Sequence, residues 1–598
     1  MMRCASIFAA AALVVVSMTL SALGQNSPKP KVKSVTYSGN VTYEASRLEG
    51  LMLTRPSRFL ATSRFRPEIF EDDLETLTTF YRQNGFLQAQ ITDTIISIDS
   101  AANEVDITIA LEEGARTFVE GVTIFGNGFF ADSALMKYIG MKRDDPLRRP
   151  VIEDAVVTLL SLYAEHGFLD ASVTPKVQVN DSAHLALVDF SIHEGVRSRV
   201  GSINIVGADR TQPYVIIREL SFSEGDTIKY SELIGSQRRL YLTGLFESVF
   251  VRPVSPAEGE AATSREIRIE LKEKQSSELA FSVGYGTVEK ARGRIELSTF
   301  NLSGTARKAG VSTEANFIKQ GASVSFSEPW TLGTRWRTDL SLFGQLRQEP
   351  AYHAEILGAK LTVGRKLGAH TTASLSFRLE NTNLSRVDLV GPVEDMDPRI
   401  RSTALTFSHD TRDNLFDPSQ GWYVNLSNEV AGSFLHGSNT FVKSVLTVKK
   451  FRPLGRQAVL GSALEFGWMD SFGETDDIPL NERFYTGGPT SLRGFSYQEV
   501  GPLDVNGEPL GGQLKLVWNL LELRQSIYRM VGGALFIEIG NVWLNPDKAS
   551  LSDLRADIGA GLRVNSPLGI VRLDYGVNVD RQGDEPRARL FLSMGQAF

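Results

Sequence analysis

A short segment late in the chain concentrates the residue types best suited to binding chemistry. It reads ERFYTGGPTSLRGFSYQEVGP, residues Glu482–Pro502, and it places Arg493 directly before Gly494 and Phe495. A guanidinium presents its N–H donors in a rigid planar fork that matches a carboxylate, and glycine lets the backbone approach a neighbouring surface closely. The segment therefore predicts a specific charged contact made by Arg493; the alternative is an arginine that only solvates a surface loop.

The rest of the sequence contains no recognisable motif of a catalytic or metal site. His166, His184 and His193 lie in a repeated region without the spacing of a metal site, and neither a nucleophile elbow nor an acid pair is recognisable. The net charge is −7 and no basic block stands out, which argues against nucleic acid as a partner. We therefore expect a protein that is not an enzyme, with no metal, no cofactor and no nucleic acid.

The second half of the chain alternates apolar residues with small or polar ones. The period of two begins at about Ser277, as in ELAFSVGYGT, and some of the alternating stretches run to about a dozen residues. At about 20 residues per strand and connection, residues 277–598 give about 16 strands. All six tryptophans lie in this half, as the aromatic girdles of a membrane barrel require. The pattern predicts an all-β transmembrane barrel of about 16 antiparallel strands, with a soluble β-sandwich as the alternative.

The connections between these strands come in two sizes. Short proline turns such as SEPW, DPSQG, FRPLG and NSPLG alternate with long polar segments such as Glu380–Ile400 and Asp470–Gly512. Short turns at one end and long loops at the other are the construction of outer-membrane barrels. Arg493 then belongs to a long loop between two strands.

An arginine that enters a barrel needs an anion there, because a guanidinium left unpaired away from water is costly. In WNLLELRQ, Leu521 and Leu523 face one way and Glu522 faces the other. In ALFIEIGNVW, Glu538 faces inward while its apolar neighbours face lipid. Glu538 and Glu522 are therefore candidate partners if Arg493 enters the barrel, and the sequence leaves open which of them forms the pair.

The first half contains a threefold repeat of about 80 residues. The stretches VKSVTYSGN, VEGVTIFGN and VGSINIVGA each end an alternating strand at a glycine, and a helical pattern follows each of them. The equivalent positions are Gly39, Gly126 and Gly207, then Tyr81, Tyr163 and Tyr241, then Phe86, Phe168 and Phe246. We predict strand–helix–helix–strand–strand units at residues 32–114, 115–195 and 196–274, in which these aromatic residues belong to the core.

The N-terminus has the features of a secretory signal. A basic start precedes an apolar run from about Ala5 to Leu20, which ends in small residues. We expect residues 1–24 to be a cleaved signal peptide, with an uncleaved membrane anchor as the alternative. The only cysteine, Cys4, would be lost with the signal, which leaves the mature chain without thiol chemistry.

These features together resemble one protein family. The repeats resemble polypeptide-transport-associated (POTRA) domains, and the Arg-Gly-Phe motif at Arg493 resembles the lumenal loop motif of the BamA/TamA family of outer-membrane assembly factors. In that family, lumenal acids hold the loop arginine, and Glu522 and Glu538 match their positions, although an aspartate is commoner in relatives where this chain has Glu538. The resemblance implies α+β periplasmic repeats followed by a barrel in the bacterial outer membrane.

The end of the chain carries a second resemblance. The terminal stretch LFLSMGQAF resembles the β-signal by which outer-membrane barrels are recognised for insertion. Its residues on one face are Leu590, Leu592, Met594 and Phe598. Glycine weakens strand pairing, so Gly595 near the end of the barrel and Gly284 and Gly286 in its first strand predict a weak lateral seam. In the family, such a seam is thought to open and to template a client strand.

The resemblance implies an assembly factor for outer-membrane proteins. Its repeats would bind unfolded barrel or autotransporter-type clients at a sheet edge, and its seam would help these clients enter outer-membrane lipid. Accessory lipoproteins, or a periplasm-spanning partner anchored in the inner membrane, are further partners that it implies. Three repeats resemble the TamA branch more than BamA.

An export pore of the two-partner secretion type is the main alternative. Such pores usually have two repeats and a helix that plugs the lumen, and Gln25–Lys33 is too short and too rich in proline to form that helix. A passive porin would leave the repeats without a role.

Overall fold

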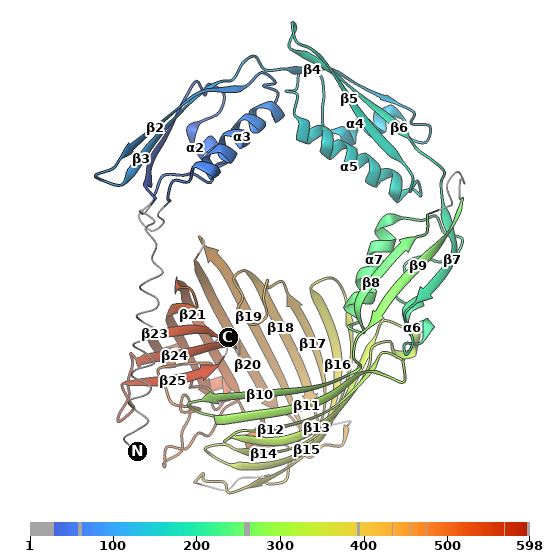
Figure 1. The fold of residues 1–598 in the computed structure, drawn as a ribbon. Helices are drawn as coiled ribbons and strands as arrows, with labels where there is room; N and C mark the ends of the chain where they lie inside the picture. The colour runs from blue at the N-terminus through green and yellow to red at the C-terminus, as the bar shows by residue number, and fades with distance from the viewer. Residues whose placement is uncertain are drawn as a thin grey trace, which may run out of the picture. The chain divides into compact units, whose positions relative to one another are not determined.

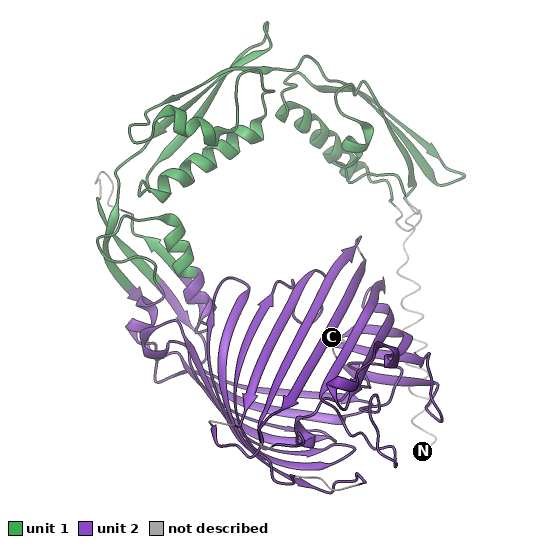
Figure 2. Ribbon diagram, turned by 180° about the vertical axis from the view of Figure 1, so that it is seen from behind, with its two compact units in different colours: residues 1–204, 220–237, 250–269 green, residues 205–219, 238–249, 270–598 purple. Residues whose placement is uncertain are grey.

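The computed structural model describes residues 29–57, 63–255, 263–390, 395–432, 435–455, 457–473, 475–566 and 569–594. The signal peptide expected at residues 1–24 lies outside the described residues. Three small mixed α/β units precede one antiparallel sheet of 16 strands (Figure 1). This arrangement confirms the predicted fold class. The chain divides into two compact units, and residues 205–219 and 238–249 of the third repeat belong to the same unit as the barrel (Figure 2).

Each repeat follows the predicted order of strand, two helices and two strands. The first contains β1 (Lys31–Ser38), α2 (Ala45–Glu49), α3 (Pro67–Gln83), β2 (Gln90–Asp99) and β3 (Glu104–Glu112). The second contains β4 (Phe118–Phe125), α4 (Asp132–Ile139), α5 (Arg149–Glu165), β5 (Ser172–Asn180) and β6 (Leu185–His193). The third contains β7 (Arg199–Val206), α6 (Pro213–Ile217), α7 (Tyr230–Leu242), β8 (Phe246–Pro253) and β9 (Ser264–Glu273). In all three sheets the last strand lies in the middle, so the first and second strands are edges.

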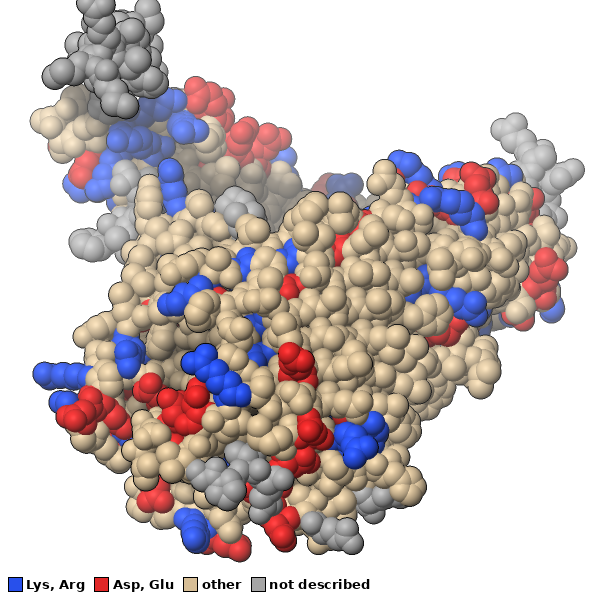
Figure 3. All heavy atoms as spheres, turned by 90° about the horizontal axis from the view of Figure 1, so that it is seen from below, with Lys and Arg blue, Asp and Glu red and all other residues tan. Residues whose placement is uncertain are grey.

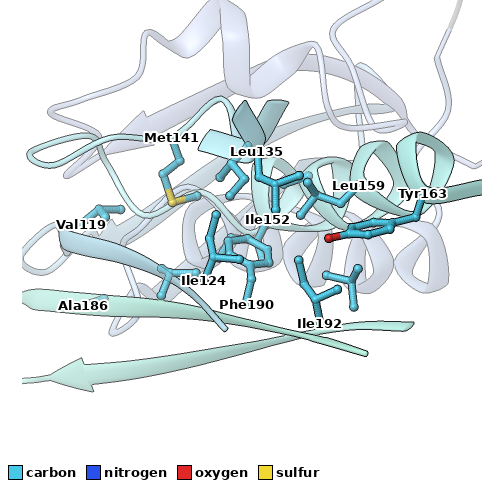
Figure 4. Packing of buried hydrophobic residues seen from close by; sticks show 14 of the residues in the cluster. Val119, Ile124, Leu135, Met141, Ile152, Leu159, Tyr163, Ala186, Phe190 and Ile192 are labelled. Atoms are coloured by element: carbon cyan, nitrogen blue, oxygen red, sulfur yellow. The ribbon is translucent and has the colours of Figure 1, made fainter. Parts of the chain in front are cut away.

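The core of the second repeat shows how helical spacing builds the unit. Helix α5 buries Ile152, Leu159 and Tyr163 along one face, and they pack toward β6, where Phe190 is fully buried (Figure 4). The Tyr163 hydroxyl donates a hydrogen bond of 2.8 Å to Glu194. Burial raises the pKa of Tyr163, and the Glu194 carboxylate raises it further, so the phenol stays protonated as a donor. None of the helices among the described residues has the length and apolar composition needed to cross a membrane.

The third repeat departs from the predicted alignment at its helix. Tyr241 is 57% exposed, whereas Leu240 is fully buried. Gly244 follows Tyr241 by three residues, but Gly85 follows Tyr81 by four, so the shorter connection moves the buried position back by one residue. The prediction that Tyr241 is a core residue is therefore wrong, and a leucine fills the place of the buried tyrosine.

The missing tyrosine changes the contacts of the carboxylate beside it. Glu113 accepts from Tyr81 and from Thr42, and Glu194 accepts from Tyr163. Glu273 accepts from Thr211 and Arg210, and no tyrosine hydroxyl is among its described partners. Thr211 also accepts a hydrogen bond of 2.8 Å from the Asn301 side chain at the start of the barrel. The neighbouring amide of Gln212 donates to the Gly304 carbonyl at 2.9 Å, in the turn after β11. The third repeat is therefore hydrogen-bonded directly to a barrel turn.

A glycine ends the first strand of every repeat because no side chain fits there. Gly39, Gly126 and Gly207 have φ values of +84°, +84° and +83°. An added Cβ would overlap the carbonyl oxygens of Leu111, Ile192 and Leu271 respectively, each on the middle strand of its sheet. The glycine that the sequence shows at the end of these strands is therefore a steric requirement of the repeat.

We expect Gly126→Ala to destabilise the second repeat by roughly 2–5 kcal/mol, because it combines an unfavourable φ with a clash. Gly140→Ala is the matched control, since Gly140 has a φ of +64° and nothing within 4 Å of an added Cβ. Its expected cost is about 1 kcal/mol, from the backbone alone. Hydrogen exchange of β6 in the full-length protein measures both effects, and equal protection in the two variants would contradict the clash.

The barrel consists of sixteen consecutive strands, each paired with its neighbour in sequence. They are β10 (Ser277–Gly286), β11 (Lys290–Leu302), β12 (Arg307–Ala315), β13 (Lys319–Glu328), β14 (Arg337–Gln348), β15 (His353–Lys366), β16 (Thr371–Ser385), β17 (Arg399–Asp410), β18 (Gly421–Ala431), β19 (Phe441–Leu454), β20 (Ala458–Ser471), β21 (Leu514–Tyr528), β22 (Val531–Trp543), β23 (Arg555–Ser566), β24 (Gly569–Asn578) and β25 (Ala588–Met594).

Alternation separates an apolar outer face from a filled interior. In β15, Leu357 is 68% exposed while Ile356 packs with Leu480 from the long loop inside the barrel. Figure 3 shows charged side chains gathered in patches, with wide areas between them that carry neither acids nor bases. The outer face is therefore suited to lipid, and the interior is packed by protein.

One predicted loop is shorter than the sequence suggested. The polar segment Glu380–Ile400 was expected to be a connection, but β16 continues to Ser385 and β17 begins at Arg399. Glu380 pairs with Ile400, and Asn381 pairs with Arg399, within a regular ladder. The prediction is wrong at both ends of this segment because polar residues continue the strands beyond their apolar part.

Candidate functional site

The loop between β20 and β21 enters the barrel and buries its arginine. Arg493 has no exposed surface, and Phe495 is 5% exposed. The backbone of the loop lies against the wall so closely that a Cβ at Gly576 of β24 would overlap the Arg493 carbonyl. The loop is therefore part of the packed interior of the barrel.

Three carboxylates surround the Arg493 guanidinium. Its Nη2 lies 2.7 Å from Oε2 of Glu522 on β21 and 2.8 Å from Oε1 of Glu538 on β22. Its Nε donates to Glu538 at 2.9 Å, and its Nη1 lies 3.5 Å from Oδ2 of Asp574 on β24. The structure brings Arg493 together with both acids proposed from the sequence, and it adds a third.

The neighbours of Arg493 fix its position further. The Arg493 amide donates to Glu538 at 2.8 Å, and the Gly494 amide donates to Asp557 of β23 at 2.8 Å. The guanidinium carbon lies 3.4 Å from the ring centroid of Phe536, so the cation stacks on an aromatic face. Four adjacent strands, β21 to β24, therefore hold one turn of the loop.

Sequence reasoning missed four charged residues of this cluster. Asp557 and Asp574 are fully buried, and Arg563 contacts Asp574 at 2.5 Å. Arg572 donates to the Pro489 carbonyl of the loop at 2.8 Å. All four residues alternate with outward apolar residues in RADIGAGLRV and IVRLDYGV, which is the same signal that identified Glu522 and Glu538. The site is therefore a mixed network of acids and arginines.

A second charged contact connects the same loop to strands β16 to β19. Glu482, which is 4% exposed, accepts from Arg378 of β16 at 2.8 Å. Arg378 also contacts Glu429 of β18 at 2.7 Å, and Lys443 of β19 donates to the Glu482 carbonyl at 2.6 Å. The loop therefore has two anchors: the Arg493 site on β21–β24 and the Glu482 site on β16–β19.

We expect Glu482→Gln to release this second anchor while the Arg493 site stays formed. The loss of one charge from a buried hydrogen-bonded pair costs about 1–3 kcal/mol, which is less than the loss of a fully buried guanidinium. Hydrogen exchange of the full-length protein should increase around residues 478–486 and stay unchanged around 491–496. Faster exchange in both segments would show that the two anchors act as one.

The two ends of the sheet meet with few hydrogen bonds. In the described parts of β10 and β25 no ladder forms between them, whereas β24 and β25 pair in register from Val571 to Val577. The Thr287 amide, just after β10, donates to the Leu592 carbonyl at 2.9 Å, and the Leu592 amide donates to the Thr287 hydroxyl at 2.7 Å. The barrel is thus nearly closed, and within the described residues, which end at Met594, the seam is held at one residue pair.

The glycines proposed for the seam lie beside the last strand. A Cβ at Gly284 would lie 3.3 Å from the Met594 sulfur, and one at Gly286 would lie 3.8 Å from the Leu592 carbonyl. Of the proposed terminal signal, Leu590 is 56% exposed, and Leu592 and Met594 are half-buried. Gly595 and Phe598 lie outside the described residues. Among the described residues, no cluster of histidine, cysteine or acidic side chains is arranged to hold a metal ion.

Comparison with known families identifies both halves of the chain. The Omp85 superfamily domain matches residues 301–598. The surface antigen variable number repeat, a POTRA repeat, matches residues 30–114, 117–195 and 198–274. These segments are close to the units inferred from the internal repeat, and they include most of the chain.

Two curated relatives are similar over most of the chain. The outer membrane protein assembly factor BamA of Nitratidesulfovibrio vulgaris is 24% identical over 561 residues, which cover 91% of this chain and 69% of the relative. The BamA of Neorickettsia risticii is 25% identical and covers 94% of this chain and 78% of the relative.

A solved structure shows the same fold. The crystal structure of BamA from Haemophilus ducreyi lacking POTRA domains 1–3 matches with a TM-score of 0.69 at 18% identity. It covers 80% of this chain and 99% of that one. The chain therefore belongs to the Omp85 superfamily, as a relative of the BamA assembly factors: an outer-membrane barrel with three periplasmic POTRA repeats.

Proposed function

We propose that this protein assembles other β-barrel proteins in the outer membrane, with no enzymatic step. Its relatives named as outer membrane protein assembly factors support the general role. The observation that carries the mechanism is the seam, where β10 and β25 contact each other through Thr287 and Leu592. When the seam parts, the edge of β10 would offer its backbone donors and acceptors to an incoming strand, which is how an unfolded chain acquires its first sheet partner.

The repeats would bind the client before it reaches the seam. In the first repeat, the edge strand β2 exposes Ile95 at 59%, Ile96 at 40% and Ile98 at 55%. An edge strand with exposed apolar side chains can pair with an extended segment and cover part of it. Unfolded outer-membrane proteins have such segments, because their strands alternate apolar and polar residues.

The loop anchored at Arg493 and Glu482 would keep the barrel in shape while the seam opens. It connects β16–β19 with β21–β24 through buried charged contacts that do not depend on the pairing of β10 with β25. The energy for insertion would come from the folding of the client, and the protein would lower the kinetic barrier. Accessory lipoproteins or an inner-membrane-anchored partner would bind at the repeats.

Depletion of the protein in its own cells tests this proposal. The expected result is the loss of many barrel proteins from the outer membrane, measured by quantitative proteomics of that fraction. Loss of a few barrels would define a specialised assembly factor. Loss of a single secreted protein, with the barrels unchanged, would overturn the proposal and favour an export pore of the two-partner secretion type.

A further inference from the structure

Two tryptophans on the barrel wall each face a cation on the next strand. Trp336 directly precedes β14, and the guanidinium carbon of Arg365 on β15 lies 5.9 Å from its ring centroid. Trp422 of β18 pairs in register with Lys450 of β19, whose ammonium lies 4.4 Å from the ring centroid. Strands β14 and β18 begin, and β15 and β19 end, at the end of the barrel where β10 begins, so both pairs lie at the periplasmic end.

Both pairs are on the lipid-facing side of the wall. Trp336 and Trp422 are 40% and 44% exposed. Four residues further along β14 and β18 on the same face are Leu340, 39% exposed, and Leu426, 39% exposed. The cations therefore stand at the margin of the apolar belt, where tryptophans of membrane proteins contact lipid headgroups.

The acids nearby lie on the other face or are already paired: Glu328 of β13 is on the lipid-facing side, and Arg307 contacts it at 2.6 Å. Asp339 alternates with Leu340 and therefore lies on the lumenal face, where it forms an ion pair of 2.7 Å with Arg337. Asp410 contacts Arg412 at 2.8 Å and pairs in register with Tyr423, which alternates with Trp422. Among the described residues, no carboxylate forms an ion pair with Arg365 or Lys450. Positive charge is thus left uncompensated on the lipid-facing side.

The turns at this end also expose large apolar side chains. Leu332, between β13 and β14, is 96% exposed; Leu367, between β15 and β16, is 61% exposed; and Phe416, between β17 and β18, is 84% exposed. Side chains of this kind are stable in the interfacial region of a bilayer, where their apolar atoms leave water. The periplasmic end from β13 to β19 therefore combines cations, tryptophans and exposed apolar residues.

We propose that the pairs Trp336–Arg365 and Trp422–Lys450 bind the phosphate headgroups of anionic phospholipids in the periplasmic leaflet of the outer membrane. The indole ring lies at the level of the headgroup and holds the cation beside it, and the cation attracts the phosphate. The acyl chains continue along the apolar wall beyond Leu340 and Leu426, which a free phosphate ion would not use. Each cation near an anionic surface is expected to contribute about a five-fold preference.

Spin-labelled lipids in bilayers that contain the full-length protein test this site. The wild-type protein should immobilise phosphatidylglycerol several-fold more than phosphatidylcholine, and the preference should fall as salt screens the charges. The double variant Arg365→Gln, Lys450→Gln should lose most of the preference. The matched control is Lys366→Gln, Lys449→Gln, which removes the same charge from the adjacent residues on the lumenal face and should keep the preference.

The two double variants separate a specific site from general attraction. Equal loss of preference in both would mean that net charge alone attracts the lipid, and it would overturn the proposal. A wild-type protein that does not distinguish the two lipids would overturn it as well, whether or not the variants insert. Loss in the first variant and retention in the control would support it.

Discussion

Replacing Arg493 with alanine is expected to detach the loop from β21–β24 and to reduce client assembly strongly. The variant would leave Glu522, Glu538 and Asp574 close together without the guanidinium that separates their charges. Removal of one partner from a buried ionic network costs about 3–5 kcal/mol, because the remaining charges stay desolvated. The insertion rate of an unfolded barrel protein into liposomes that contain the purified variant measures the functional effect.

The comparison that isolates the site uses Arg386→Ala. Arg386 also contacts an aspartate, Asp388, but its side chain is 69% exposed, so its loss should change neither loop nor assembly. Hydrogen exchange should rise in residues 484–500 of the Arg493→Ala protein and stay constant in the repeats. Wild-type insertion by Arg493→Ala would remove the loop from the mechanism.

Locking the seam with a disulfide is expected to stop assembly reversibly. The pair Gly284→Cys and Met594→Cys spans the seam, because a Cβ at position 284 would lie 3.3 Å from the side chain of Met594. If the client must pair with the edge of β10, the oxidised protein should insert clients at the background rate of empty liposomes. Reduction should restore the rate of the uncrosslinked protein.

A second disulfide shows whether crosslinking itself is harmful. Ser312 and Ser323 face each other in the ladder between β12 and β13, with their hydroxyl oxygens 2.9 Å apart. Cysteines at these positions join strands that are already fully paired, so oxidation should leave assembly unchanged. A fully oxidised seam variant that still inserted clients would contradict lateral opening.

Alternation was sufficient to predict most of the barrel and part of its interior site. Inward positions on β21 and β22 identify Glu522 and Glu538, because a strand places every second residue on the same face. The same rule also predicts that Asp557 and Asp574 face inward. It requires that the charged residues between the glycines and apolar residues of β23 and β24 are considered. What the period does not give is which inward residues meet, since this depends on how the sheet closes and where the loop descends.

Contacts across the lumen could not be predicted from the sequence. Glu482 and Arg378 belong to different hairpins and are brought together by the curvature of the whole sheet. The predicted end of the loop before β17 was wrong for a related reason. Arg399 and Ile400 were assigned to the loop, but both pair with β16 and belong to a strand. Local composition describes a strand only as far as its apolar face continues.

The prediction of a buried tyrosine in the third repeat was wrong because the helix ends one residue earlier there. One residue fewer before Gly244 moves Leu240 into the core and turns Tyr241 outward. A match of residue type at nearly constant spacing was therefore misleading, while the glycines at Gly39, Gly126 and Gly207 were reliable because each meets the same carbonyl position.

The contacts of Glu273 have a consequence for repeat engineering. The third repeat lacks a bond from tyrosine to glutamate, and its Thr211 connects Glu273 to Asn301 of the barrel. In the first repeat, Glu113 accepts from both Tyr81 and Thr42, so a tyrosine does not prevent a threonine from binding the same carboxylate. A chimaera that places another repeat beside the barrel therefore needs a hydroxyl at the position of Thr211 to accept from Asn301.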